Sequence, residues 1–325
     1  MSPPPLTLVQ QWLHDLQSQD RSTNTVRSYR SGVRRFLMWY ETEECRPLDL
    51  ADLTPIALMT YRNALQHTQA RATSSVNLQV AALRSWCAWL TDHGYLVTDP
   101  AARLRFIGQT GHTGPRGLKD REVNALLREA QRTRHPARDY AILQMLLQTG
   151  MRIGECAALR LYDVQFKERH GAVLIRGGKG NKARTVPLNG SIRKALAEYV
   201  APRLGVAPSL EAVTAVWPRR QHPEDAAAVW LSQKGGALSM PAIRAMIDLL
   251  VRDCSSRGLV PPETSAHTLR HTFALSYLKQ YPGDLIGLAT LLGHSSLDTT
   301  RIYGQPSAEQ LADRVDRLGL NAYDS

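Results

Sequence analysis

The sequence predicts two joined parts: a helical N-terminal domain and a larger, mixed α/β domain that is mainly helical with a small antiparallel sheet. Three observations support this fold class. The chain has 325 residues, which exceeds the usual size of one compact core. Apolar residues recur at helical spacing through about the first hundred residues. The clearest β-rich segments, in contrast, lie in the middle of the chain.

The first part of the chain is predicted to be a unit of four helices. Residues 6–16 place apolar side chains at the i, i+3, i+4, i+7 spacing of one buried helix face. Ser22-Thr23-Asn24 can cap a second helix, and Thr54-Pro55 combines a cap with a proline at the first helical position of a third. Ser74-Ser75 can open the fourth. We expect this helical domain to occupy residues 1–106.

A change in composition separates the two predicted domains. Residues 108–117 are rich in glycine and polar side chains and have no apolar period, which is typical of a linker. We therefore place a linker at residues 107–117 and the second domain at residues 118–325.

The second domain combines helical periodicity with a predicted β-hairpin. Two β-rich runs, 172–176 and 183–188, flank the glycine-rich basic segment 177–182, which predicts two strands joined by a basic tip. Residues 229–232 predict a third strand. Ser307-Ala-Glu-Gln310 is a capping box, so we expect a last helix to follow it.

The composition favours a nucleic-acid partner. The chain has 40 Lys+Arg against 29 Asp+Glu, a formal charge of +11, so an extended polyanion is attracted through counterion release. No apolar run reaches the roughly 18 to 20 residues that span a bilayer, and the N-terminus lacks the pattern of a secretory signal. We therefore expect a cytoplasmic protein with no membrane association. Four cysteines without a C-x-x-C pair argue against zinc and against a disulfide framework.

One face of the predicted second helix is basic. Arg27, Arg30, Arg34 and Arg35 cluster there, opposite the apolar side. A solvated surface and a set of DNA phosphate contacts are both consistent with this pattern.

Four separated segments carry the polar residues that a basic protein could direct at a phosphate. They are Thr149-Gly-Met-Arg-Ile-Gly-Glu155, Gly178-Lys-Gly-Asn-Lys-Ala-Arg184, His267-Thr-Leu-Arg-His-Thr272 and Leu292-Gly-His-Ser-Ser-Leu-Asp-Thr-Thr-Arg-Ile-Tyr303. In the order Arg, Lys, H-x-x-R, G-H, Tyr, the sequence resembles the tyrosine recombinase family of phage integrases and Xer recombinases. A single H-x-x-R motif carries little weight, but five elements in the family's order rarely coincide.

The resemblance implies a role for each matched residue. Arg152 and Arg270 would clamp the oxygens of the scissile phosphate, because a guanidinium can bond two oxygens at once. Tyr303 would be the nucleophile, and a 3′-phosphotyrosine intermediate would retain the bond energy, so no cofactor and no metal would be needed. Glu155 would orient its neighbours.

The proton-transfer roles also follow from the resemblance. Lys179 would protonate the departing 5′ oxygen, although Lys182 and Arg184 on the same hairpin compete for this role or contact DNA phosphates. His267 would transfer protons, and His294 would support the phosphate and the nucleophile. His271 is expected to be a core or capping residue.

The resemblance further implies an architecture and partners. The N-terminal part would be a SAM-like core-binding domain, and the second part a tyrosine-recombinase catalytic domain that closes around double-stranded DNA. A homo-tetramer would act on two DNA sites, with a partner recombinase as an open alternative. The helix that carries Leu311, Val315 and Leu318 either docks on a neighbouring protomer or packs on its own domain.

Two alternatives to a site-specific recombinase remain at this point. A non-catalytic DNA-binding protein could keep the fold, but intact motifs weigh against it. A type IB topoisomerase uses similar chemistry as a monomer, but the spacing from H-x-x-R to G-H to tyrosine favours a recombinase.

Overall fold

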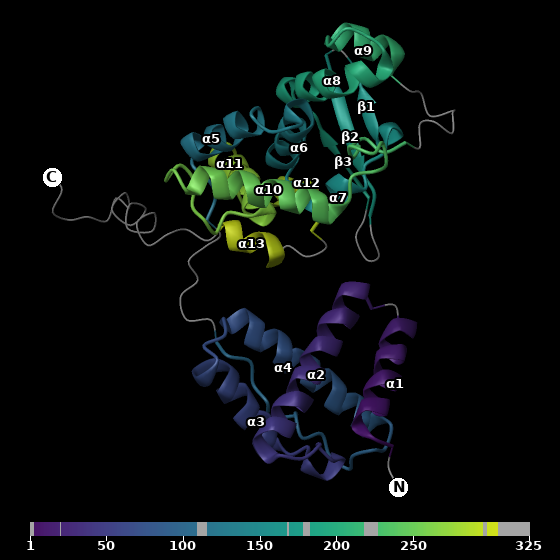
Figure 1. Ribbon diagram of the computed structural model, residues 1–325, viewed down its shortest axis with the longest axis vertical. Helices are drawn as coiled ribbons and strands as arrows, with labels where there is room; N and C mark the ends of the chain where they lie inside the picture. The colour runs from purple at the N-terminus through teal and green to yellow at the C-terminus, as the bar shows by residue number, and fades with distance from the viewer. Residues whose placement is uncertain are drawn as a thin grey trace, which may run out of the picture. The chain divides into compact units, whose positions relative to one another are not determined.

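The computed structural model describes residues 3–19, 21–108, 116–167, 169–177, 183–217, 227–294 and 298–304. The chain divides into two compact units, Met1–His112 and Thr113–Ser325, each with its own hydrophobic core (Figure 1). The predicted fold class, a helical unit followed by a mainly helical unit with a small antiparallel sheet, is confirmed. The predicted final helix from Ser307 onward lies outside the described residues.

The first unit is a helical bundle built around buried aromatic residues. Its elements are α1 (Pro5–Ser18), α2 (Thr23–Glu44), α3 (Pro55–Asn63) and α4 (Thr73–Asp92), with short helical segments at Leu50–Asp52 and Ala64–Thr68. Ser22 and Thr54 cap α2 and α3 as predicted. No side chain caps α4, in contrast to the expectation for Ser74-Ser75. Trp12 and Trp86 are fully buried, so α1 and α4 contribute directly to the core.

The second unit is a group of helices with a three-stranded sheet at one side (Figure 1). Its elements are α5 (Asp120–Ala130), α6 (Pro136–Thr149), α7 (Ile153–Ala157), a 3-10 turn (Leu161–Asp163), β1 (Val164–Phe166), β2 (Gly171–Ile175), β3 (Arg184–Pro187), α8 (Gly190–Leu204), α9 (Leu210–Val216), α10 (Met240–Ser255), α11 (Ala266–Gln280), α12 (Leu285–Leu292) and α13 (Asp298–Gly304). The sheet order is β1-β2-β3, all antiparallel. The predicted hairpin is confirmed, with Ile175 opposite Arg184. Its tip, which includes Lys179 and Lys182, lies outside the described residues.

The third strand of the sheet is not the one that the sequence predicted. It is β1, which has three residues and is too short for an alternating pattern to be recognised. The segment around residues 229–232 makes isolated β-bridges instead of a strand of this sheet. Ala228 pairs with Arg160, and Leu231 pairs with Ala237. Trp230 in this segment is fully buried. The apolar composition of residues 229–232 therefore reflects insertion into the core rather than a strand.

Gly150 ends α6 and leads directly into the first motif. Its φ of +62° is left-handed, and an added Cβ would contact the Phe273 ring and lie 2.8 Å from Leu292 Cδ2. We expect Gly150→Ala to lower the free energy of unfolding by about 2–4 kcal/mol, because backbone strain and overpacking add. Gly258 is the matched control, since its φ is +66° with nothing within 4 Å; Gly258→Ala should cost about 1 kcal/mol in the same denaturant titration. Equal losses would contradict the predicted overpacking.

Candidate active site

The helix α11 is the centre of the candidate site. Ser265 caps it by accepting a hydrogen bond from the backbone N–H of Thr268. His267 lies in the first turn and is exposed, whereas Arg270 lies one turn later and is buried, with 3% of its surface exposed. The two residues of the H-x-x-R motif therefore differ in exposure: His267 faces solvent, and Arg270 lies in the interior.

Arg270 connects three of the four motif segments. Its guanidinium donates hydrogen bonds to the carbonyl oxygens of Gly150, at 2.5 Å, and Leu292, at 2.8 Å. The same group lies 2.9 Å from Nε2 of His294. Burial, together with the nearby charge of Arg152, lowers the pKa of Arg270 to about 10. The side chain remains a cation at neutral pH, fixed by the backbone on both sides.

Arg152 and Glu155 form the second part of the site. Arg152 is the N-cap of α7, and its Nη1 lies 3.1 Å from Oε1 of Glu155. The backbone N–H of Arg152 also donates to Glu155 Oε2 at 2.8 Å. The Arg152 side chain is 46% exposed, so this cation is oriented by Glu155 while it still faces solvent.

Arg184 differs from its prediction as a DNA-binding residue. Its side chain is only 5% exposed, and its two terminal nitrogens bond the two carboxylate oxygens of Glu155 at 3.0 and 2.7 Å. Its Nε donates to the carbonyl oxygen of Leu291 at 2.7 Å. The expectation of a phosphate contact is corrected, because this guanidinium is committed to an internal ion pair. Arg184 joins strand β3 to the first motif and to the end of α12.

Breaking this ion pair should destabilise the second unit. Burial alone would raise the pKa of Glu155, but hydrogen bonds from Arg184 and from the Arg152 backbone outweigh it and lower the pKa. We expect Arg184→Ala to lower the free energy of unfolding by about 3–5 kcal/mol, because a largely buried carboxylate loses its buried cation and keeps, among the described residues, the half-exposed Arg152 as an ionic partner. Glu155 stabilises the fold fully at neutral pH, and its contribution is lost as the pH falls through its lowered pKa. The loss in Arg184→Ala should therefore shrink in acid.

A surface ion pair provides the control for this measurement. Arg257 pairs with Glu129, and its side chain is 43% exposed. Arg257→Ala should cost much less than Arg184→Ala in the same denaturant titration, because exposed ion pairs contribute little to stability. Similar losses for the two variants would show that burial adds nothing to the Arg184 pair.

His294 bridges Arg270 to the helix that carries the tyrosine. Because arginine can only donate, Nε2 of His294 must accept from Arg270. Nδ1 of His294 lies 2.8 Å from Oγ1 of Thr300 in α13. Burial, together with the nearby charge of Arg270, lowers the pKa of His294 to about 4. The ring is therefore neutral at pH 7, its proton lies on Nδ1, and it donates to Thr300.

Tyr303 lies in α13, which packs against α11 and α12 (Figure 1). Its ring is buried, with 8% of the residue exposed, beside Leu288 and Leu292. Burial raises the pKa of Tyr303, while the charges of Arg270 and Arg152 act in the opposite direction. The phenol is protonated at neutral pH and lies within the electrostatic field of both arginines.

His271 was missed as a functional candidate from the sequence. We expected a core or capping residue, but its Nδ1 lies 2.7 Å from the Tyr303 hydroxyl. Its ring also meets that of His267, with centroids 4.2 Å apart and planes at 75°. Helical spacing offered a signal, since residues four apart lie on one face. The position of Tyr303 against that face could not be read from the sequence.

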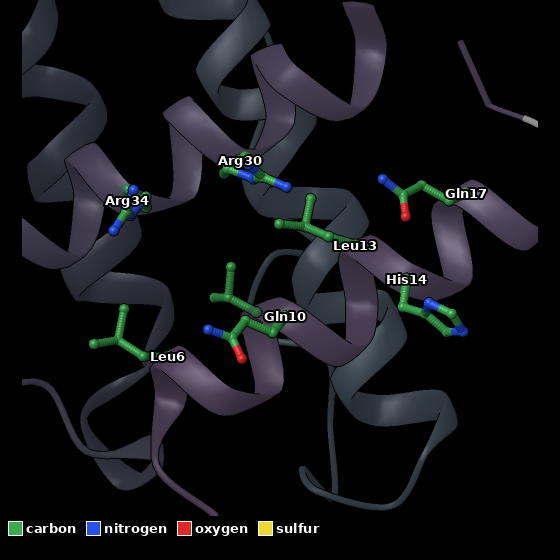
Figure 2. A pocket seen from close by; sticks show the side chains of 8 residues that line it. Leu6, Gln10, Leu13, His14, Gln17, Arg30 and Arg34 are labelled. Atoms are coloured by element: carbon green, nitrogen blue, oxygen red, sulfur yellow. The ribbon is translucent and has the colours of Figure 1, made fainter. Parts of the chain in front are cut away.

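The four arginines of α2 are exposed on the first unit. Figure 2 shows Arg30 and Arg34 of α2 beside a groove that α1 completes with Gln10, His14 and Gln17. The predicted cluster therefore exists as a solvent-facing group of cations. Among the described residues, no group of three or more acidic, histidine or cysteine side chains is placed to hold a metal ion.

Comparison with known proteins identifies the family. Residues 116–310 match the phage integrase family, and residues 9–94 match the N-terminal SAM-like domain of phage integrases. The chain belongs to the phage integrase family. This integrase is 31% identical to the tyrosine recombinase XerC of Xanthomonas campestris pv. campestris (strain B100) over 313 residues, 96% of this chain and 88% of that protein. It is 30% identical to XerC of Oceanobacillus iheyensis, over 91% of this chain and 90% of that protein.

The fold of the integrase is also similar to that of a solved recombinase structure. It resembles the crystal structure of the XerH site-specific recombinase bound to a palindromic difH substrate, with a TM-score of 0.69 and 21% identity over 92% of this chain and 81% of that one. The integrase is thus a tyrosine-type site-specific recombinase related to the Xer proteins. In the part of the chain that the structure describes, no helix is long and apolar enough to cross a membrane.

Proposed function

We propose that the integrase cleaves double-stranded DNA with Tyr303 and rejoins it at a second site. The observation that carries this proposal is the convergence of three motifs around α11. Arg270 contacts Gly150 and Leu292, and Tyr303 contacts the next residue of the same helix, His271. Residues far apart in the sequence thus place a phenol and permanent cations in one site.

The proposed reaction is a transfer of a phosphoryl group between oxygens. The Tyr303 oxygen attacks phosphorus, the bond to the 5′ oxygen breaks, and the strand is left as a 3′-phosphotyrosine with a free 5′ hydroxyl. The phenol loses its proton and the departing 5′ oxygen gains one. A second 5′ hydroxyl then reverses the step and releases Tyr303. The reaction conserves the number of phosphodiester bonds, so it needs no energy source.

The cations would stabilise the charge that develops on the phosphate. Arg152 is exposed and oriented by Glu155, and Arg270 is fixed by backbone carbonyls. Guanidinium groups held in advance need little rearrangement during the reaction. Lys179 is proposed as the acid for the 5′ oxygen, His267 as a proton carrier, and neutral His294 as the support of Arg270 and α13.

The arginines of α2 are proposed to bind DNA phosphates. We expect a variant with Arg27, Arg30, Arg34 and Arg35 changed to glutamine to bind DNA less tightly, with a shallower salt dependence. Each lost phosphate contact should reduce the slope of log K against log salt by about 0.9. Arg46→Gln is the control variant in the same unit, because the Arg46 guanidinium already pairs with Asp52 at 2.6 Å. An unchanged slope in the quadruple variant would assign these arginines to a solvated face.

The recombinase is proposed to act in the cytoplasm as a homo-tetramer on two DNA sites, with or without a partner recombinase. This assembly follows from the chemistry, because exchange between two duplexes requires four strand cleavages and therefore four nucleophiles. Cross-linking on DNA followed by mass measurement should give a tetramer. A monomer that relaxes supercoiled plasmid of any sequence would instead favour a topoisomerase.

The decisive experiment is the capture of the covalent intermediate. Nicked fragments of genomic DNA would trap the protein, because the 5′ end that reverses the reaction diffuses away. Digestion of the SDS-resistant adduct and mass spectrometry should map the nucleotide to the peptide that contains Tyr303. Sequencing of the trapped DNA would identify the site. Binding of the fragments without any adduct would contradict cleavage by this chain alone.

A further inference from the structure

Two side-chain hydrogen bonds join the short nucleophile helix to the rest of the site. Thr300 bonds His294 at 2.8 Å, and Tyr303 bonds His271 at 2.7 Å. Both histidines are linked to Arg270: His294 through its Nε2, and His271 as the neighbouring residue of α11. The short helix is therefore joined to Arg270 through His294 and to α11 through His271.

We propose that His271 is a positioning residue that fixes the Tyr303 hydroxyl for attack. This inference deepens the function proposed above and rests on Tyr303 being the nucleophile. His271 acts through the tyrosine and need not touch the DNA. Its role is to restrict the rotation of the Tyr303 side chain, so that the phenol oxygen stays next to the cations before DNA binds.

The other two histidines of the site do not hold the hydroxyl in this arrangement. Nε2 of His294 is occupied by Arg270, and its Nδ1 by Thr300. His267 contacts the His271 ring edge-on, and this contact helps to fix the plane of His271. Among the described residues, His271 is the side chain that bonds the Tyr303 oxygen.

The electrostatics of His271 suit a neutral hydrogen-bond partner. Burial, together with the charges of His267 and Arg270, lowers the pKa of His271 to about 4. At neutral pH its ring carries no charge, so it adds no repulsion toward Arg270. With the ring proton on Nε2, Nδ1 accepts from the phenol, which is itself protonated because burial raises its pKa.

The packing of Tyr303 explains why such a partner is needed. The ring lies on apolar side chains of α12, including Leu288 and Leu292. These contacts hold the ring but do not direct its oxygen, because dispersion contacts have little directionality. A hydrogen bond at the end of the ring supplies the missing direction. A misdirected oxygen lowers the rate even where binding is intact.

The test compares two replacements of His271 in the full-length protein. His271→Ala removes the partner, whereas His271→Asn keeps a polar oxygen near the position of Nδ1. Single-turnover cleavage of a nicked substrate and DNA affinity are measured for each, and thermal unfolding checks the fold. We expect about a tenfold loss of cleavage rate in His271→Ala, the factor that one net hydrogen bond supplies. His271→Asn should recover most of this loss, with DNA affinity unchanged in both.

His93→Ala is the matched control, because Nδ1 of His93 also makes a hydrogen bond, at 2.9 Å to the Trp89 carbonyl oxygen in the first unit. It should cleave like the unmodified protein. Cleavage by His271→Ala at the normal rate or faster would overturn the positioning role, as would equal defects in the Ala and Asn variants. Tyr303→Phe, measured alongside, separates the two proposals: an adduct in that variant would refute the nucleophile itself.

Discussion

Tyr303→Phe is expected to abolish covalent adduct formation while it leaves DNA binding within about twofold of the unmodified protein. The change removes one oxygen from a ring that stays packed on α12. Loss of a nucleophile costs on the order of 10⁴-fold or more, because no other group replaces it in the site. The variant also loses one hydrogen bond to His271, which should lower the free energy of unfolding by only about 1 kcal/mol. Gel analysis of nicked substrates under SDS measures the adduct.

A second tyrosine serves as the control for this result. Tyr277 also ends in a hydrogen bond, to Oδ2 of Asp284 at 2.6 Å. It lies on α11, and within the described part of the chain no hydrogen bond joins it to Arg270, whose partners are Gly150, Leu292 and His294. Tyr277→Phe should cleave DNA at nearly the normal rate. An adduct that persists in Tyr303→Phe and disappears in Tyr277→Phe would show that Tyr277 is the nucleophile. That result would refute the assignment of Tyr303.

The fold could be predicted because its main signals are local. The helices of the first unit follow from apolar spacing and from caps such as Ser22 and Thr54, which act within one turn. The hairpin of β2 and β3 follows from two β-rich runs around a glycine-rich turn. The third strand was misplaced because β1 is short and a buried apolar run at Trp230 has a similar composition.

The identity of the candidate site residues could also be predicted, but their contacts could not. The order of the motifs pointed to Arg152, Arg270, His294 and Tyr303 without any distances. Two contacts depend on how distant elements pack. Arg184 faces Glu155 across 29 positions of sequence, and His271 faces Tyr303 across 32. A basic residue on a hairpin and a second histidine in a motif have no local feature that reveals such partners.

Arg270→Lys is expected to impair cleavage by about 10²- to 10³-fold, a typical loss for one preorganised charge donor. The lysine keeps the charge, but a single ammonium cannot reproduce the geometry of a guanidinium that reaches Gly150, Leu292 and His294 together. His294 would lose its donor, so its tautomer and its bond to Thr300 would no longer be fixed. DNA affinity should change little, because the positive charge remains.

Stability and catalysis should respond together in this variant, because the same contacts serve both. Two buried carbonyl oxygens lose a donor, which should lower the free energy of unfolding by about 1–3 kcal/mol. Arg257→Lys, at an exposed pair with Glu129, should change neither quantity measurably. Cleavage of Arg270→Lys within about threefold of normal would show that charge alone suffices at this position. The rigid bridge from Gly150 to Leu292 would then serve the fold and not the reaction.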